Sequence, residues 1–467
     1  MKNKNVIRFK IAKKRHENTL RRERKKRLKV KSRLMSIYTF KESLGGGKIT
    51  YDKLLDKYLP TNISFLLNNS TSDFNIKKLL TIQPNKSGNF KVPKHFSLID
   101  KPKESYKFIQ EVTAALITQS TKRVQMDYSE CESIDLEAQV FLDIILKDIV
   151  AFYNKIANIY NHKIEWIGGI NINHENIEKL LFSVGSPAIH SNKTVKFKDI
   201  IPYKLCIHDR ESNQTLLKIS EQKDIDTTTL VDYVLECLKR LGKKLTPDSI
   251  DNLCTVIGEI LINAEEHSTT KYRFSIGYFQ EINQNGKHFG VFRLVIMNFG
   301  KTIYEKFKDP LCPNPSIVHS MEKLSKRYTK KKFFFEEFEE ETLWTLYALQ
   351  EGVTSIAPSI YKKRGNGSIG IIDSFFNIKG KKKDADDISR MALISGNTNI
   401  IFDGTYNIVK GINSVGEPVK IMTFNNSGNI EDKPDSKFVK FVENYFPGTI
   451  TSAKILFNED DLTHDSR

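Results

Sequence analysis

The sequence is poor in cysteine, and its cysteines form no motif. Only five occur among 467 residues, and no two of them make a Cys-x-x-Cys pair. An odd number of widely scattered cysteines argues against a disulfide framework and against a cysteine-based zinc cluster. No His-x-x-x-His or His-Glu-x-x-His run occurs either. The sequence therefore favours a reducing compartment and predicts no dedicated metal centre of these kinds.

Long apolar runs are also missing. No segment approaches the roughly 18 uninterrupted apolar residues that a membrane helix needs. The first residues contain Arg and Lys at short intervals and so lack the apolar stretch of a secretory signal. We therefore expect a cytoplasmic protein with no membrane segment.

Two widespread catalytic motifs are absent. The chain has no Gly-x-Ser-x-Gly run and no Gly-x-x-x-x-Gly-Lys-[Ser/Thr] run, which argues against a hydrolase elbow and a P-loop. Apolar residues nevertheless make up 39% of the chain and include 29 Phe, enough to fill globular cores. At roughly 150 residues per domain, the length predicts two or three domains.

Positive charge is concentrated at the N-terminus. Residues 1–34 hold 16 of the Lys and Arg residues and only Glu17 and Glu23 as acids, whereas the whole chain carries +17. The rest of the chain is therefore close to neutral. We interpret residues 1–47 as a basic arm that ends in a hinge, Gly45-Gly46-Gly47.

The arm has too few apolar residues to anchor a core helix. It is either a solvated tail or a segment that binds the phosphates of RNA or DNA through residues 1–34, and an acidic protein or a membrane surface is a further alternative. Residues 21–34 contain no aromatic residue, so base stacking by this stretch is not indicated. Residues 48–104 have no assigned role.

Strands and helices alternate from residue 105 onward. The patterns predict helices over 105–118, 136–158 and 175–184 and strands over 123–128 and 163–170. This alternation is typical of a parallel sheet with helices packed on it. The run DYSECESIDLEA, Asp127 to Ala138, resembles the strand-to-helix turn of STAS domains. We therefore assign residues 105–222 to a STAS-like α/β domain that could dock a protein partner.

STAS domains of the anti-sigma-antagonist type carry a phosphorylated Ser in this turn. The corresponding residues here are Asp135, Leu136, Glu137 and Ala138, which have no hydroxyl group. We therefore predict a structural or docking role for this segment and no phosphorylation switch.

The segment VIGEILINAEEHS, Val256 to Ser268, carries the strongest motif. A helix is predicted to begin at Thr246-Pro247, because Thr caps exposed amides and Pro is tolerated at the first helical position. Glu259, Asn263 and His267 recur every four residues and so fall on one line of this helix. Polar side chains beside an apolar stripe need a polar partner.

This run resembles the N box of the GHKL superfamily, which includes type II topoisomerases, mismatch-repair ATPases, histidine kinases and anti-sigma serine kinases. The resemblance implies that Asn263 binds the magnesium ion that bridges the phosphates of ATP. It also implies that Glu259 is the general base where hydrolysis occurs. His267 is either a phosphate contact or a polar flank.

Three later segments follow the order that the superfamily requires. Asn298-Phe299-Gly300 stands where the family has its Asp-x-Gly loop, whose acid reads adenine; Asn can still accept a hydrogen bond, but Thr302 replaces a second Gly. A glycine-rich loop with Gly365, Gly367 and Gly370 resembles the phosphate loop of the family. A Gly-Thr step then enters the last predicted strand, and the insertion at 304–364 corresponds to the ATP lid.

We therefore predict an α/β protein, α+β overall, in which the STAS-like domain is followed by a Bergerat-type α/β sandwich at 223–458 and an acidic polar tail at 459–467. The predicted function is an ATP- and magnesium-dependent regulator of the GHKL ATPase class, in which nucleotide switches the lid and the preceding modules. Two alternatives stay open: a protein kinase of the anti-sigma serine type, and a nucleic-acid-binding protein with a non-hydrolytic ATP site. The superfamily resemblance also implies homodimerisation.

Overall fold

The computed structural model describes most of the chain after the basic arm. The described residues are 51–160, 162–189, 197–209, 216–268, 270, 272–284, 287–329, 338–355, 367–378, 389–412, 418–456 and 462–464. The arm at 1–47 lies outside them. The described residues fall into two compact units: those within 51–90, 109–125 and 145–167 form the first, and those within 91–108, 126–144 and 168–464 form the second.

Short helices characterise the first unit. They are α2 (Tyr51–Tyr58), α3 (Thr61–Asn68) and α4 (Ile76–Leu79), and they lie in the stretch without an assigned role. Tyr51 and Tyr153 are both buried, and their hydroxyl groups lie 2.9 Å apart. The Tyr51 hydroxyl donates to the carbonyl of Ile117 and that of Tyr153 to the carbonyl of Leu116. Each buried hydroxyl is thus satisfied, as burial of a polar group requires.

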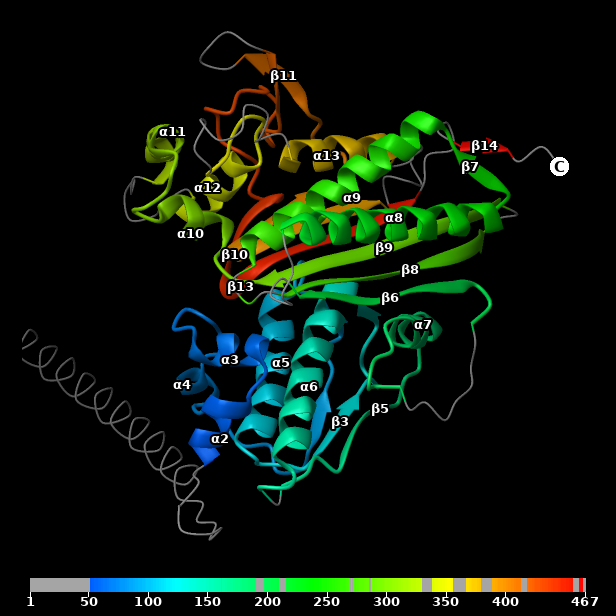
Figure 1. Cartoon of the computed structure of the whole chain (residues 1–467), viewed down its shortest axis with the longest axis vertical. Helices are drawn as coiled ribbons and strands as arrows, with labels where there is room; N and C mark the ends of the chain where they lie inside the picture. Colours follow the sequence, from blue (N-terminus) through cyan, green and yellow to red (C-terminus); the bar gives the residue numbers. More distant parts are fainter. Residues whose placement is uncertain are drawn as a thin grey trace, which may run out of the picture. The chain divides into compact units, whose positions relative to one another are not determined.

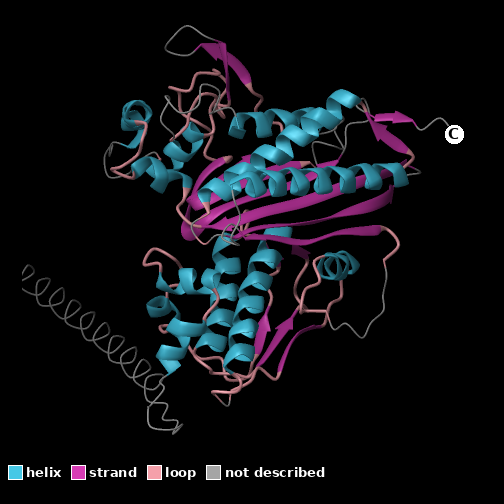
Figure 2. Ribbon diagram, viewed as in Figure 1, coloured by secondary structure: helices cyan, strands magenta, loops and turns pink. Residues whose placement is uncertain are grey.

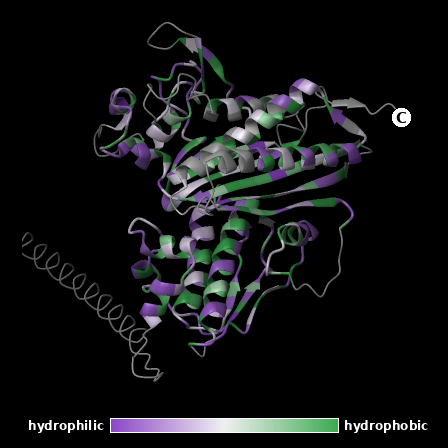
Figure 3. Cartoon of the chain, viewed as in Figure 1, coloured by the Kyte–Doolittle hydropathy of each residue, from purple (hydrophilic) through white to green (hydrophobic). Residues whose placement is uncertain are grey.

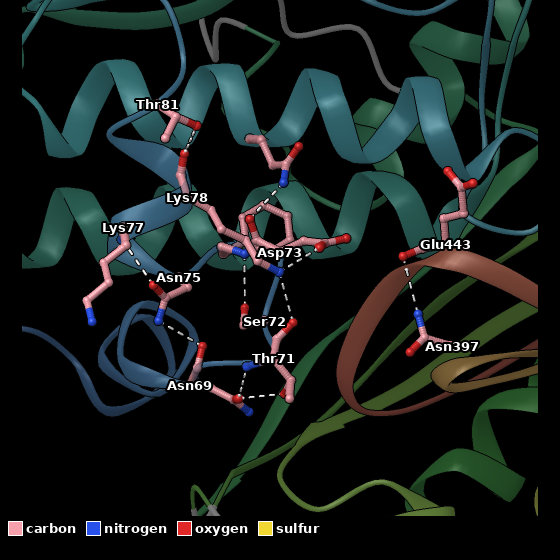
Figure 4. A network of polar contacts seen from close by, with 12 residues as sticks. Asn69, Thr71, Ser72, Asp73, Asn75, Lys77, Lys78, Thr81, Asn397 and Glu443 are labelled. Carbon is pink, nitrogen blue, oxygen red and sulfur yellow. Dashed lines mark hydrogen bonds and ion pairs between the residues drawn. The ribbon is translucent and has the colours of Figure 1, made fainter. Parts of the chain in front are cut away.

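Side chains of the α3–α4 connection form a local polar network (Figure 4). The Asn75 carboxamide accepts from the amide of Lys77 at 3.0 Å and donates to the carbonyl of Asn69 at 3.0 Å. Lys78 forms an ion pair with Asp73 at 3.1 Å. These bonds cap α4 and close the turn that precedes it.

The second unit is built on a five-stranded sheet of order β10-β13-β9-β8-β6. All neighbours in this sheet are antiparallel. Its strands are β6 (Ile200–Asp209), β8 (Tyr272–Gln284), β9 (Lys287–Phe299), β10 (Arg390–Phe402) and β13 (Val439–Leu456). The sequence did not predict a strand at 200–209. It also placed these residues in the STAS-like domain, which was predicted to end at residue 222, whereas β6 forms an edge of this sheet.

Three helices lie on one face of this sheet (Figures 1 and 2). Helix α9 (Pro247–His267) packs against β8, β9 and β13 and is flanked by α8 (Leu216–Arg240) and α13 (Gly367–Ile378). Apolar residues dominate the strands, as the green stretches along the sheet in Figure 3 show. Leu294 and Ile296 of β9 share a buried core with Ile257 and Leu261 of α9. An apolar stripe on the helix therefore buries one sheet face.

The elements predicted between residues 105 and 184 are present with small changes at their ends, and two strands from before residue 105 pair with strands in this range. The helices are α5 (Pro102–Ile117), α6 (Leu136–Ile156) and α7 (Glu175–Ser183). Strands β1 (Asn89–Lys91), β3 (Arg123–Asp127) and β5 (Trp166–Ile170) form a three-stranded sheet of order β1-β3-β5. A separate pair, β2 (His95–Phe96) and β4 (Ser133–Ile134), is parallel. Helices α5 and α6 each contribute residues to both units.

Three helices and two small ladders complete the second unit. The helices are α10 (Ile303–Lys308), α11 (Pro315–Thr329) and α12 (Glu340–Ala348). Strand β11 (Val409–Ile412) pairs with β12 (Pro418–Ile421), and β14 (Leu462–His464), within the predicted polar tail, pairs antiparallel with β7 (Lys243–Leu245). The chain is thus a mixed α/β protein of α+β type. None of its described helices has the length and apolarity to cross a membrane.

Candidate functional site

Helix α9 begins where the sequence predicted. The Thr246 hydroxyl accepts from the amide of Ser249 at 3.3 Å, and Pro247 takes the first helical position. Glu259, Asn263 and His267 all lie within the helix, so their four-residue spacing repeats along one side of it. The side chains of these three residues lie outside the described part of the structure. Their roles as base, magnesium ligand and phosphate contact stay predictions.

Asn298 is a fully buried polar residue of the five-stranded sheet. It lies near the end of β9, and its side chain is 0% exposed. Neither the nitrogen nor the oxygen of its carboxamide has a hydrogen-bond partner among the described residues. Leaving such a group unsatisfied costs about 1–3 kcal/mol. A buried donor and acceptor held side by side therefore predict a polar ligand.

A cavity of about 60 Å³ lies beside Asn298. Its walls come from α9 through Ile260 and Ala264, and from β13 through Thr449 and Thr451. Apolar residues of α13 and β10 and the residues after β9 and α12 complete the lining (Ile303, Leu349, Ile372, Met391, Ala392, Leu393 and Phe402). The space exceeds what one water molecule needs but is smaller than a purine base, so a base would have to displace part of this wall.

Two glycines bring the end of β9 and the middle of β13 together, and the Gly-Thr step lies within β13 and not at its start. Gly448 lies opposite Phe299 in the ladder, and a Cβ atom at Gly448 would come within 2.1 Å of the Asn298 carbonyl oxygen. The φ angle of Gly448 is +147°, which side chains rarely adopt. The amide of Gly300 donates to the carbonyl of Pro447 at 3.1 Å. The Asn-x-Gly loop and the Gly-Thr step, far apart in the sequence, thus form one corner of the cavity.

Thr302, which replaces the second glycine of the family loop, has a structural role. Its hydroxyl accepts from the amide of Glu305 at 3.1 Å, and the Glu305 carboxylate accepts from the amide of Thr302 at 2.8 Å. This capping box starts α10 directly after β9. Thr302 therefore serves as a helix cap.

Sequence reasoning missed Ser395, a buried residue of β10. Its hydroxyl accepts from the amide of Ile303 at 3.0 Å and donates to the carbonyl of Gly448 at 3.1 Å. The serine thereby joins β10, the start of α10 and the Gly-Thr step. No periodicity or motif surrounds Ser395, so its role follows only from the pairing of β10 with β13.

The glycine-rich segment is described only in part. Gly365 lies outside the described residues, whereas Gly367 and Gly370 fall in the first turn of α13. A Cβ atom at Gly370 would meet nothing within 4 Å. Helix α13 packs against α9, the helix that contains Glu259, Asn263 and His267. Contact of these glycines with a phosphate stays a prediction.

The segment predicted to be a lid is helical and has its own buried contacts. Trp344 of α12 is fully buried and donates from Nε1 to the Ser325 hydroxyl of α11 at 3.1 Å. Its ring meets that of Tyr304 of α10 edge to face, with centroids 5.5 Å apart. Helices α10, α11 and α12 therefore pack as one group.

Two side chains tie α12 and its C-terminal end to the strands. Glu341 accepts from the amide of Asn397 at 2.8 Å, and burial raises the pKa of its carboxyl to about 7. Gln350 accepts from the amide of Met422 at 2.8 Å and donates to its carbonyl at 3.0 Å. A movement of α12 would have to break both connections.

The described residues contain no group of three or more His, Cys, Asp or Glu side chains suited to hold a metal ion. Comparison with known proteins gives no match: no family model, no curated protein and no solved structure matches the chain. The interpretation of the cavity beside Asn298 therefore rests on the residues of this chain.

Proposed function

We propose that the chain is an ATP- and magnesium-dependent regulator of the GHKL ATPase class, and that the base binds at Asn298. The unpartnered, fully buried carboxamide of Asn298 carries this proposal. Its oxygen suits the exocyclic amino group of adenine, and its nitrogen suits a ring nitrogen. Apolar residues of α9, β10 and α13 around it suit the faces of a base.

The arrangement of elements also supports the proposal. Helix α9, the end of β9, Thr449 of the Gly-Thr step and Ile372 of α13 line one cavity. Under the superfamily resemblance the second unit contains a Bergerat-type sandwich, and the elements from α5 to α7 are a STAS-like module. Bound magnesium would neutralise phosphate charge, with Asn263 as its ligand and Glu259 as the base.

Asn298→Leu in the full chain tests the proposal directly. The substitution keeps the size of the side chain but removes both hydrogen-bonding atoms, and we expect affinity for ATP with magnesium to fall at least about tenfold. Isothermal titration calorimetry measures the change. Asn399→Leu is the matched control, because Asn399 is equally buried on the same sheet but uses its carboxamide nitrogen on the Leu98 carbonyl at 3.0 Å.

Several results would reject the proposal. Wild-type protein that binds no ATP with magnesium would do so, as would an Asn298→Leu variant with undiminished affinity. An Asn carboxamide can also pair with guanine, so GTP belongs in the same titration. If the chain prefers GTP to ATP, the base bound at Asn298 is guanine and not adenine, and the location of the site is unchanged.

The fate of the γ-phosphate separates the regulator from the kinase alternative. Release of labelled phosphate that Glu259→Ala abolishes, with binding retained, supports hydrolysis. Transfer of the label to a protein supports a kinase of the anti-sigma serine type. Tight binding with neither outcome supports a non-hydrolytic ATP site.

A further inference from the structure

A second, larger cavity lies in the second unit. Its volume is about 550 Å³, within the roughly 300–1,000 Å³ typical of pockets for small molecules. Strands β8, β9, β10 and β13 form one wall, and α7 and the turn at 132–137 form another. Leu294 and Ile296 face α9. Because successive side chains of a strand point to opposite faces, Arg293 lies on the other face of the sheet. The two cavities therefore lie on opposite faces of the same sheet.

Three basic residues form a row across this wall. Arg390 of β10 is directly opposite Lys454 of β13, and Lys454 is directly opposite Arg293 of β9. Tyr278 of β8 continues the row opposite Arg293. Like charges placed opposite each other destabilise a sheet. A row of three cations on neighbouring strands therefore needs negative charge beside it.

Among the described residues, an ion pair is present at only one end of this row. The Arg390 guanidinium forms two short bonds to the Asp100 carboxylate, at 2.6 and 2.7 Å. Arg293 contacts neutral groups, the Gln280 carboxamide oxygen at 3.2 Å and the Tyr278 ring at 4.9 Å. Lys454 makes no ion pair with any described residue. Burial and the two guanidinium groups lower the pKa of Lys454, and the nearby Asp135 carboxyl opposes them.

Three carboxyl groups of residues 132–137 line the same cavity, and one of them, Glu132, forms an ion pair with Lys94 at 3.0 Å. Glu137 is 1% exposed; its Oε2 accepts from the Ser452 hydroxyl at 3.3 Å, and its Oε1 has no partner among the described residues. Burial raises the pKa of Glu137 well above its usual value, and burial likewise raises the pKa of Asp135. Burial thus favours the neutral form of both, whereas the Arg390 guanidinium favours the charged form of both and Lys454 favours that of Asp135.

We propose that this cavity binds a small organic anion, with its carboxylate or phosphate against Lys454 and Arg293 and a hydroxyl or amino group hydrogen-bonded to Glu137. An oxyanion between the two cations relieves their repulsion and gains charge-assisted hydrogen bonds. The unpartnered Oε1 of Glu137 supplies a second, directional contact. This site differs from the nucleotide site in both position and chemistry.

Calorimetric titration of the full chain with citrate and with ribose 5-phosphate tests the proposal, because each anion also carries hydroxyl groups. We expect at least one to bind, and Lys454→Met to weaken that binding at least about tenfold, the loss of one charge-assisted contact. Lys410→Met, at an exposed lysine of β11, is the matched control for the loss of one positive charge. Sodium chloride at equal ionic strength controls for screening.

Failure of both anions to bind the wild type would overturn the proposal, as would full binding by Lys454→Met. If that variant does not fold, as judged by circular dichroism, Arg293→Gln replaces it with the same expected weakening and the same contradicting result. If citrate binds, tricarballylate, which lacks the hydroxyl group, is expected to bind more weakly; equal binding would contradict the Glu137 contact. Asn298→Leu should leave anion binding unchanged, so this test is independent of the nucleotide proposal.

Discussion

Thr449 lies directly opposite Asn298 in the ladder between β13 and β9. This pairing places the hydroxyl-bearing residue of the Gly-Thr step beside a buried carboxamide that has no partner among the described residues. Both residues line the same cavity. The strand register therefore places two polar residues side by side in a pocket that is lined mainly by apolar side chains.

Gly448→Ala is expected to destabilise the chain by about 2–4 kcal/mol. The added Cβ would approach the Asn298 carbonyl oxygen to 2.1 Å, and the backbone angle is unfavourable for alanine. Urea unfolding followed by circular dichroism measures the free energy change. Gly370→Ala is the matched control: it lies in a helix with open space around it, so we expect no loss, or a gain of about 0.5–1 kcal/mol. Equal effects of the two changes would contradict the predicted contact.

Thr302→Ala is expected to lower the free energy of unfolding by about 1 kcal/mol, because it removes the hydroxyl that caps α10. Thr302→Ser retains that hydroxyl and should retain most of the stability. The same urea titration compares the two variants. A serine variant as unstable as the alanine variant would show that the Thr302 methyl group, and not the cap, matters.

Glu341 should make stability depend on pH. Its pKa in the folded state is about 7, above the usual 4.5, because the carboxyl is buried. The folded state therefore binds more protons than the unfolded state between these values. The Glu341 contribution to the free energy of unfolding is present at low pH and is lost as pH rises toward 7, by on the order of 1–3 kcal/mol.

Unfolding at pH 5 and pH 8 measures this dependence. Glu341→Gln keeps an oxygen for the Asn397 amide but cannot ionise, so its stability should fall less between the two values than that of the wild type. Glu443→Gln, at an exposed carboxyl, is the control and should behave like the wild type. If the stability of Glu341→Gln depends on pH as much as that of the wild type, Glu341 is not the cause of the pH dependence.

Deletion of residues 1–34 tests the basic arm. If the arm binds nucleic-acid phosphates, the truncated chain should lose salt-sensitive binding to RNA and DNA, measured by fluorescence anisotropy at two salt concentrations. ATP affinity should stay the same. Nucleic-acid affinity that survives the deletion would favour the interpretation of the arm as a solvated tail.

Local patterns were sufficient to predict several helices and strands. The apolar spacing around Ile257 and Leu261, with Thr246-Pro247 before it, indicated α9 almost to its ends. The alternation in residues 105–184 likewise indicated α5, β3, α6 and α7. These signals are local, because periodicity and caps act within one element.

Relationships between distant strands could not be predicted in this way. The row from Arg390 through Lys454 to Arg293 depends on the registers of two ladders, and no single segment contains it. The edge strand Ile200–Asp209 and the pairing of Leu462–His464 with Lys243–Leu245 were missed for the same reason. The burial of Asn298 without a partner also became visible only from the packing of α9 and β13 around it.

The position of β13 in the sheet has a consequence for synthesis of the chain. This strand lies between β9 and β10, yet residues 439–456 emerge from the ribosome after both of them. Until then β9 and β10 each have an apolar edge without its final neighbour, and such edges favour aggregation. Folding of this unit should therefore finish only after β13 has been synthesised and should be sensitive to chaperone supply.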